Sequence, residues 1–444
     1  MIIWLTFVGM GIFVYFILRR TRQAFQELGS RRNPEFFYTN LKSEMLGVPV
    51  FTYHSIAERS TPDSITPIEF EEHMRYLAEN GYNALCADEL YGYLVDGNSI
   101  PNKSVVITFD DGRATLWTVA YPIIKKYGFK IISFVIPDAM SGSGVRPTLD
   151  DYEDGKPITL TELLNADLSN MPSITWDEAK IMHDSDLVDF QSHTLNHSLI
   201  FYTPEIVDFI NPDYDFGYNN YSIPIMRYED VDQLYQRPHL GTPIYRYKSR
   251  MSAAKRFFDD EELRKACVDY VKIHGGEEFF YQSEWREKLY HFVEMYRRQH
   301  NSRGYFETQQ EQKRTIQYSL VHSKRLIEEH LPGKTVRHLC YPWHRYSALA
   351  TYLSRESGYV TNFIDINPQK PMPDWNDPYY IQRKLPINEY GDDPYQITRI
   401  GAEGNMILSL PGKGRLSYHH RFISRFMKVP RFIERLLDEN TGLD

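Results

Sequence analysis

Two neighbouring carboxylates follow an apolar run near residue 110. Residues 104–109 are mostly apolar or β-branched, and the chain then continues as Asp110, Asp111 and Gly112. A short apolar run bounded by turn residues is typical of a buried strand, and ligands of α/β folds bind where such strands end. Adjacent carboxylates at that position repel each other, which favours the binding of a cation by one of them. An ordinary Asp-Gly turn is the alternative that this segment alone leaves open.

Two histidines four residues apart end a second apolar segment, residues 186–197. On a helical turn, this spacing puts the imidazoles of His193 and His197 on one face, close enough to share a metal ion. A His pair alone is more often a surface pair. Together with Asp111, however, the pair would supply two nitrogen ligands and one oxygen ligand and leave positions open for water, which is the arrangement of a catalytic site.

The residue types at these two segments predict a hydrolytic chemistry. A divalent ion on Asp111, His193 and His197 would bind water and lower its pKa from about 15.7 towards 7. Asp110, beside the ligand Asp111, would accept the proton as that water attacks an amide carbonyl. Nitrogen and oxygen ligands accept zinc, cobalt, nickel or iron; zinc is the first expectation, and the sequence does not choose among them.

The two segments together resemble a known family. Thr108-Phe-Asp-Asp-Gly112 followed by His193-Thr-Leu-Asn-His197 is similar to the first two motifs of the polysaccharide deacetylases, the NodB-homology group of carbohydrate esterase family 4. The resemblance covers about residues 48–200 and 310–400. It implies a distorted (β/α)7-type barrel in the α/β class. Further matching segments are residues 51–56, 70–82, 176–180 and 340–343.

The resemblance also assigns roles at the matching positions. Asp110 corresponds to the catalytic base and Asp111 to the metal ligand. The third motif, Cys340-Tyr-Pro-Trp343, places the backbone N–H of Tyr341 as a donor to the tetrahedral oxyanion. A donor of this kind is worth ~3 kcal/mol in other enzymes.

The resemblance implies that a histidine protonates the leaving amine. Most of the family uses a C-terminal His, but in the branch with an N-terminal Tyr-His-X-Ile segment this His comes first, and His54 matches it here. His419 and His420 lie near the C-terminus without a matching motif. A buried strand-end His bonded to a neighbour is the alternative for His54.

One position departs from the family pattern. Cys340 stands where many relatives carry an Arg that helps to set the base, although the position is small in the branch that this sequence resembles. Arg383, on a later predicted strand, is the candidate for supplying the missing charge near Asp110. A surface strand Arg is its alternative.

Length, charge and cysteine content limit the class of protein. A chain of 444 residues is long enough for one large domain plus additions. Its formal net charge of −9 argues against a nucleic-acid binder. The cysteines Cys86, Cys267 and Cys340 give no disulfide framework and no zinc-knuckle spacing. Alternating strand and helix patterns over residues 48–136 predict a parallel sheet or barrel.

The N-terminus predicts a membrane anchor. Residues 2–18 are uncharged and mostly apolar, and Arg19-Arg-Thr-Arg22 follows them. Because no basic region precedes the apolar run, an uncleaved transmembrane helix is favoured over a signal peptide. The expected location is the cell (inner) membrane. The face stays open, since the flanking charges favour a cytoplasmic domain whereas many relatives act outside the cytoplasm.

The expected organisation is a transmembrane anchor (1–18), a linker (19–47), a deacetylase domain (48–410) and a basic C-terminal tail (411–444). Within the domain, residues 201–309 form an insertion that is expected to be largely helical. It forms a lid or wall of the substrate groove, or else is ornamental. The tail alternates basic and apolar residues, which suits either a membrane surface or a packed terminal helix.

The predicted function is metal-dependent removal of N-acetyl or N-formyl groups from amino sugars. The expected substrate is a polysaccharide or a lipid-linked oligosaccharide at a membrane, with no nucleic acid involved. O-deacetylation by the same site is one alternative. A non-catalytic glycan-binding pseudoenzyme in surface-polymer assembly is the other, and the presence of Asp110 and His54 beside the metal ligands speaks against it.

Overall fold

The fold is that of a computed structural model, in which the described residues are 45–140, 142–301, 303–364, 386–402 and 406–412. The predicted anchor over residues 1–18 and nearly all of the basic tail lie outside them. Within the described ranges, no helix combines the length and the apolar character that crossing a bilayer requires.

The centre of the molecule is a parallel sheet whose strands are buried. Its strand β5 (Ser104–Asp111) is buried along its whole length, as expected for an apolar run without polar alternation. The parallel pairing confirms the predicted alternation of strands and helices. In spatial order, β5 is followed by β6 (Ile131–Val135), β7 (Val188–Ser192), β14 (His338–Cys340) and β15 (Thr361–Ile364), and β1 (Val48–Tyr53) lies on its other side.

A short run near the C-terminus closes this sheet. Strand β17 (Ile397–Thr398) pairs with β15, and β18 (Ile400–Gly401) pairs with β1 on the opposite edge of the sheet. Only Arg399 separates the two strands, so a single stretch of chain bridges the first and last strands. The result is the barrel-like α/β fold that the sequence predicts, with the antiparallel strand β16 (Ile387–Asn388) added beside β1.

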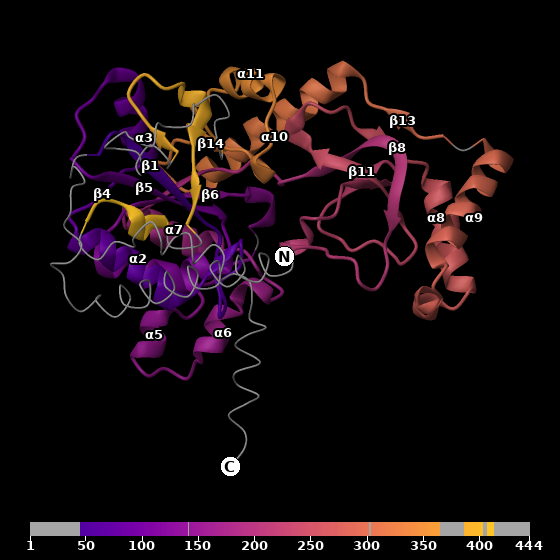
Figure 1. The fold of residues 1–444 in the computed structure, drawn as a ribbon, viewed down its shortest axis with the longest axis horizontal. Helices are drawn as coiled ribbons and strands as arrows, with labels where there is room; N and C mark the ends of the chain where they lie inside the picture. Colours follow the sequence, from indigo (N-terminus) through magenta and orange to yellow (C-terminus); the bar gives the residue numbers. More distant parts are fainter. Residues whose placement is uncertain (1–44, 141, 302, 365–385, 403–405, 413–444) are drawn as a thin grey trace, which may run out of the picture.

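Helices cover the outside of the barrel (Figure 1). The sequence predicts the start of α2 (Pro67–Glu79), and the structure has the capping box there: the Thr66 hydroxyl accepts from the Glu69 N–H while the Glu69 carboxylate accepts from the Thr66 N–H. Helix α10 (Gln309–His330) begins after Thr308, which forms a second capping box with Glu311. The helices α4 (Tyr121–Tyr127), α7 (Trp176–Asp184) and α11 (Ala348–Glu356) complete the layer.

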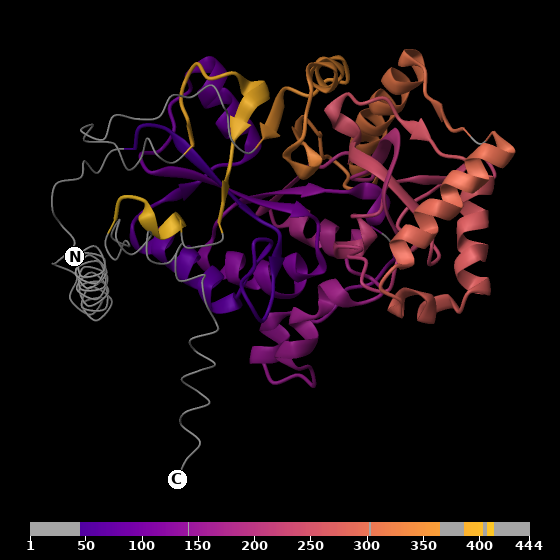
Figure 2. The same ribbon diagram turned by 45° about the vertical axis from the view of Figure 1, so that its right-hand side comes forward.

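The insertion forms a lobe beside the barrel with a hydrophobic core of its own (Figures 1 and 2). It opens with an antiparallel pair, β8 (Leu199–Phe209) and β11 (Pro243–Ser249). The helices α8 (Glu261–Ile273) and α9 (Trp285–His300) follow.

The expectation of a largely helical insertion is therefore wrong for its first half. Strands β8 and β11 are rich in Tyr, Phe, Ile, Val and Thr, which favour a half-buried pleated surface. A further strand pair of the insertion joins β12 (Phe257–Phe258) to β13 (Tyr305–Phe306).

Candidate active site

The predicted site residues meet where the parallel strands end. Asp110 and Asp111 are the last two residues of β5, and His193 follows β7 directly. Cys340 ends the neighbouring strand β14. Because parallel strands end at the same edge of a sheet, residues far apart in the sequence lie together at the C-terminal mouth of the barrel.

Three buried side chains form a group that fits one metal ion. Asp111 Oδ1 lies 3.6 Å from His193 Nε2 and 3.7 Å from His197 Nε2. The three ligand atoms are all within 4.8 Å of one another. Ligands bound tetrahedrally at about 2.1 Å are separated by about 3.4 Å. The observed spacing is close to that value, so the residues present can hold a divalent ion without large movement.

The two histidines reach this position from a loop, which corrects the predicted helical turn. Thr194 has φ 66° and His197 has φ 51°, so the backbone turns back on itself between β7 and β8. The His193 Nδ1–H donates to the Cys340 carbonyl at 3.0 Å, because a carbonyl oxygen can only accept. This bond fixes the ring and leaves the Nε2 lone pair directed towards Asp111.

Arg113 orients the carboxylate of Asp111. Its Nε and Nη2 donate to Asp111 Oδ2 at 3.1 and 3.0 Å, which leaves Oδ1 facing the two histidines. Burial raises the pKa of Asp111, but Arg113 and then His197 outweigh burial and lower it well below its usual range. Arg113 belongs to none of the sequence motifs described above, although its place two residues after the proposed ligand is a usable signal.

Arg399 holds the second carboxylate. Its Nη1 donates to both oxygens of Asp110 at 2.8 Å, and both side chains are fully buried. Burial raises the pKa of Asp110, yet Arg399, followed by His193 and His54, lowers it to about 2. Asp110 is therefore ionised at neutral pH, as a general base must be.

The hypothesis for Arg383 is not tested by the structure. Arg383 lies outside the described residues, and the charge beside Asp110 comes from Arg399. No sequence motif marks Arg399, which is placed by the closure of the barrel between β17 and β18.

His54 reaches the site from the end of β1. Its Nε2 lies 4.0 Å from Asp110 Oδ2, and its side chain is 17% exposed whereas that of Asp110 is 1% exposed. Asp110 Oδ2 also accepts from the Cys340 thiol at 3.5 Å. The predicted acid, base and metal ligands are thus brought together by the fold, with His54 as the member most open to solvent.

The Tyr341 N–H already has a hydrogen-bond acceptor within the sheet. It donates to the Phe363 carbonyl at 3.3 Å as part of the ladder between β14 and β15. The side chain is buried, and its hydroxyl accepts from the Asn362 amide at 2.8 Å. Stabilisation of an oxyanion by this N–H therefore requires that the donor be shared with Phe363, and this role stays a prediction.

Aromatic rings form a wall against the metal ligands. The Trp343 ring lies 4.8 Å from the His197 ring, and the Tyr221 ring lies 5.1 Å from it. Tyr218 stacks on the Arg113 guanidinium at 4.1 Å. Because Tyr218 and Tyr221 come from the insertion, the insertion contributes directly to the wall of the site.

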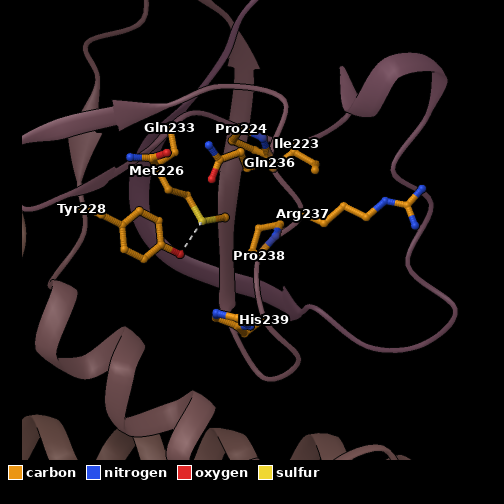
Figure 3. A pocket seen from close by; sticks show the side chains of 9 residues that line it. All are labelled: Ile223, Pro224, Met226, Tyr228, Gln233, Gln236, Arg237, Pro238 and His239. Carbon is orange, nitrogen blue, oxygen red and sulfur yellow. Dashed lines mark hydrogen bonds between the residues drawn. The ribbon is translucent and has the colours of Figure 1, made fainter. Parts of the chain in front are cut away.

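A separate cavity of about 280 Å³ lies inside the insertion (Figure 3). The Tyr228 hydroxyl approaches the Met226 sulfur there at 4.0 Å. Arg237 points away from these two side chains in Figure 3, and its Nε donates to Asn220. None of the predicted catalytic or ligand residues lines this cavity, so it is not the reaction site.

A family model described as polysaccharide deacetylase matches residues 97–210. That range contains both carboxylates of β5 and both histidines of the loop after β7. The match thus covers three of the proposed ligands and the proposed base.

The chain is also similar to individual proteins. The Bacillus subtilis (strain 168) protein YxkH, whose name refers to the polysaccharide deacetylases, is 39% identical over 89 residues, which is 20% of this chain and 32% of that protein. A poly-beta-1,6-N-acetyl-D-glucosamine N-deacetylase of Staphylococcus aureus (strain MSSA476) is 34% identical over 73 residues, 16% of this chain and 25% of that protein. The chain therefore covers about a third or less of these relatives.

Among solved structures, a de-N-acetylase from Aggregatibacter actinomycetemcomitans superimposes with a TM-score of 0.45 and 19% identity. That comparison covers 80% of this chain and 95% of the other.

Proposed function

Since this chain belongs to the polysaccharide deacetylase family, we propose that it is a metal-dependent hydrolase that removes N-acetyl groups from amino sugars. The observation that carries the proposal is that two adjacent buried carboxylates face different partners. Asp111 faces two histidines, and Asp110 is ionised beside Arg399. The named activity of the Staphylococcus aureus relative supports an N-acetylated polysaccharide as substrate. An N-formyl group or a lipid-linked saccharide belongs to the same proposal.

Asp111, His193 and His197 would hold the metal ion. The spacing of their ligand atoms fits, and His193 is already fixed by its bond to Cys340. When bound, a divalent ion supplies Lewis acidity, which lowers the pKa of water and polarises a carbonyl. Zinc is the first candidate, with cobalt, nickel and iron compatible with the same ligands.

The other groups of the site accept and donate protons. Asp110 accepts the proton of the attacking water, and Arg399 keeps that carboxylate ionised and oriented. His54, which is partly exposed and 4.0 Å from Asp110, gives a proton to the leaving amine. Each such transfer contributes about 10²- to 10⁴-fold to the rate in enzymes of known mechanism.

Two alternative functions would use the same residues differently. An O-deacetylase would use the same base and ligands but release an alcohol. A glycan-binding pseudoenzyme needs the cleft and has no use for an ionised buried base. The buried ion pair of Arg399 with Asp110 favours an enzyme, because maintaining an ionised carboxylate in the interior is costly without a role for it.

The test is acetate release from N-acetylglucosamine oligomers by the zinc-loaded chain. Asp110→Asn keeps the metal ligands, so bound zinc should stay near one per chain while kcat falls about 10²- to 10⁴-fold. Asp154→Asn, at an exposed residue, is the matched control and should leave kcat unchanged. Unchanged release in Asp110→Asn would remove the proposed mechanism. Acetylated xylose oligomers, tested in parallel, separate N- from O-deacetylation.

A further inference from the structure

A large open cavity adjoins the candidate active site on the side of the insertion. Its volume is about 620 Å³, within the range of about 300–1,000 Å³ typical of ligand sites. It lies between the end of β11 and the loop after β14, and Trp343 forms part of its wall. The Trp343 ring also lies 4.8 Å from the ring of the proposed ligand His197, so this one side chain borders both the cavity and the candidate active site. The lining residues are Leu199, Ser222, Tyr247, Lys248, Ser249, Ser252, Trp343, Arg345 and Tyr346.

The charged residues of this cavity are all basic. Lys248 comes from the insertion and Arg345 from the barrel, and both are exposed. Among the described residues, no carboxylate lies within ion-pair distance of either side chain. Arg246, on the same strand as Lys248, differs in this respect because its guanidinium pairs with Glu205. The lining of the cavity contains no Asp or Glu.

The remaining lining suits a sugar. Tyr247 is 40% exposed and Trp343 is 37% exposed, so both side chains are accessible from solvent. Tyr346 is anchored by stacking on Tyr341 at 5.7 Å between ring centroids. Aromatic faces pack on the apolar faces of sugar rings, and the serine hydroxyls at the rim can bond to sugar hydroxyls.

A second cavity provides a contrast, because two of its arginines are paired with carboxylates. It lies where the insertion meets α10. There, Arg250 donates two hydrogen bonds to Glu307, and Arg256 pairs with Asp232. Arg250 and Arg256 thus have carboxylate partners, whereas no carboxylate in the part of the chain that the structure describes pairs with Lys248 or Arg345.

We propose that Lys248 and Arg345, with the rings of Tyr247, Trp343 and Tyr346, form a basic subsite that binds an anionic group beside the acylated amino sugar. The group is a carboxylate or a phosphate, which both bind charge-assisted donors of this kind. The inference rests on the proposed function and narrows its substrate class to anionic saccharides. A local basic surface is needed because the whole chain carries a formal net charge of −9, which repels anions at long range.

The test compares three probes on the full zinc-loaded chain. The neutral probe is an N-acetylglucosamine tetramer. The carboxylate probe is a tetrasaccharide of alternating glucuronate and N-acetylglucosamine. The phosphate probe is N-acetylglucosamine joined through a diphosphate to a short polyprenyl chain. Binding is measured by calorimetry with the Asp110→Asn chain, which does not consume the probe, and KM is measured with the wild-type chain.

The paired variant Lys248→Gln with Arg345→Gln should weaken binding of an anionic probe about tenfold or more, since two charge-assisted contacts are removed. Binding of the neutral probe should change less than twofold. Arg246→Gln is the matched control, because it removes a basic residue from the same strand outside the cavity. Preference for the carboxylate or for the phosphate probe identifies the source of the charge.

Two results would overturn the subsite. One is that neither anionic probe binds more tightly than the neutral tetramer. The other is that the paired variant weakens all three probes equally. The proposed function can fail independently of the subsite. If no probe releases acetate but calorimetry still shows tighter binding of the anionic probes, the subsite is supported and the deacetylase activity is not. Acetate release without any charge preference gives the opposite conclusion.

Discussion

At the scale of single residues, the ion pair of Arg399 and Asp110 should determine whether Asp110 can act as the proposed base. Burial raises the pKa of Asp110, and Arg399 provides the largest opposing effect, so that the pKa falls to about 2. In Arg399→Met, burial should dominate and the pKa of Asp110 should rise. Because the base acts when deprotonated, the acid limb of the kcat/KM profile should then move to higher pH.

The measurement is the pH profile of kcat/KM with an N-acetylglucosamine oligomer. Arg399→Lys keeps the charge and is the control, with a smaller shift expected because one ammonium cannot reproduce the guanidinium geometry. An acid limb in Arg399→Met that coincides with the wild-type limb would show that Arg399 does not set the ionisation of Asp110.

The same residues show how far a sequence can identify a site. Asp110 and Asp111 are adjacent, and His193 and His197 are four apart, so short patterns contain them. Arg399 is 289 positions from its partner, and it lies between the two short strands β17 and β18. Only the closure of the barrel brings it to the base, which no local pattern encodes.

At the scale of elements, the structure joins the insertion to the barrel through Tyr218. Its ring lies on the Arg113 guanidinium at 4.1 Å, and its hydroxyl donates to the Pro172 carbonyl at 2.6 Å. Tyr218→Leu removes both contacts and should destabilise the chain by about 1–3 kcal/mol in urea unfolding. The activity should fall as well, because Arg113 orients the proposed ligand Asp111.

Tyr218→Phe separates the two contacts, since it keeps the ring and loses only the hydrogen bond. It should cost about 1 kcal/mol and leave kcat close to the wild-type value. Equal loss of activity in the Phe and Leu variants would mean that the ring does not act through Arg113.

The elements that sequence patterns predicted well are those with one dominant signal. The strand β5 is a continuous apolar run, and α2 carries a complete capping box. The pair β8 and β11 was missed because Pro204 and Glu205 interrupt the apolar pattern of β8, and the short strand β11 alternates Tyr with basic residues. The loop of His193 and His197 was taken for a helical turn because spacing alone does not reveal left-handed residues such as Thr194.

At the scale of the whole molecule, the barrel and the inserted lobe both contribute residues to the candidate active site. The barrel contains the proposed acid, base and metal ligands, and the lobe contributes Tyr221 beside His197 and Lys248 in the proposed basic subsite. On the proposed function, the barrel would carry out the reaction and the lobe would select the saccharide. The predicted anchor over residues 1–18 would hold this assembly at a membrane and stays a prediction.

Metal binding should also stabilise the whole chain, because the three ligands come from two separate segments that only folding brings together. Free zinc at about 100 times its dissociation constant should raise the free energy of unfolding by about 2.7 kcal/mol. A chelator should remove this increment, and thermal unfolding with and without zinc measures it. His193→Gln should abolish the zinc-dependent shift, whereas His300→Gln, at the exposed end of α9, should retain it. An undiminished shift in His193→Gln would place the stabilising ion elsewhere.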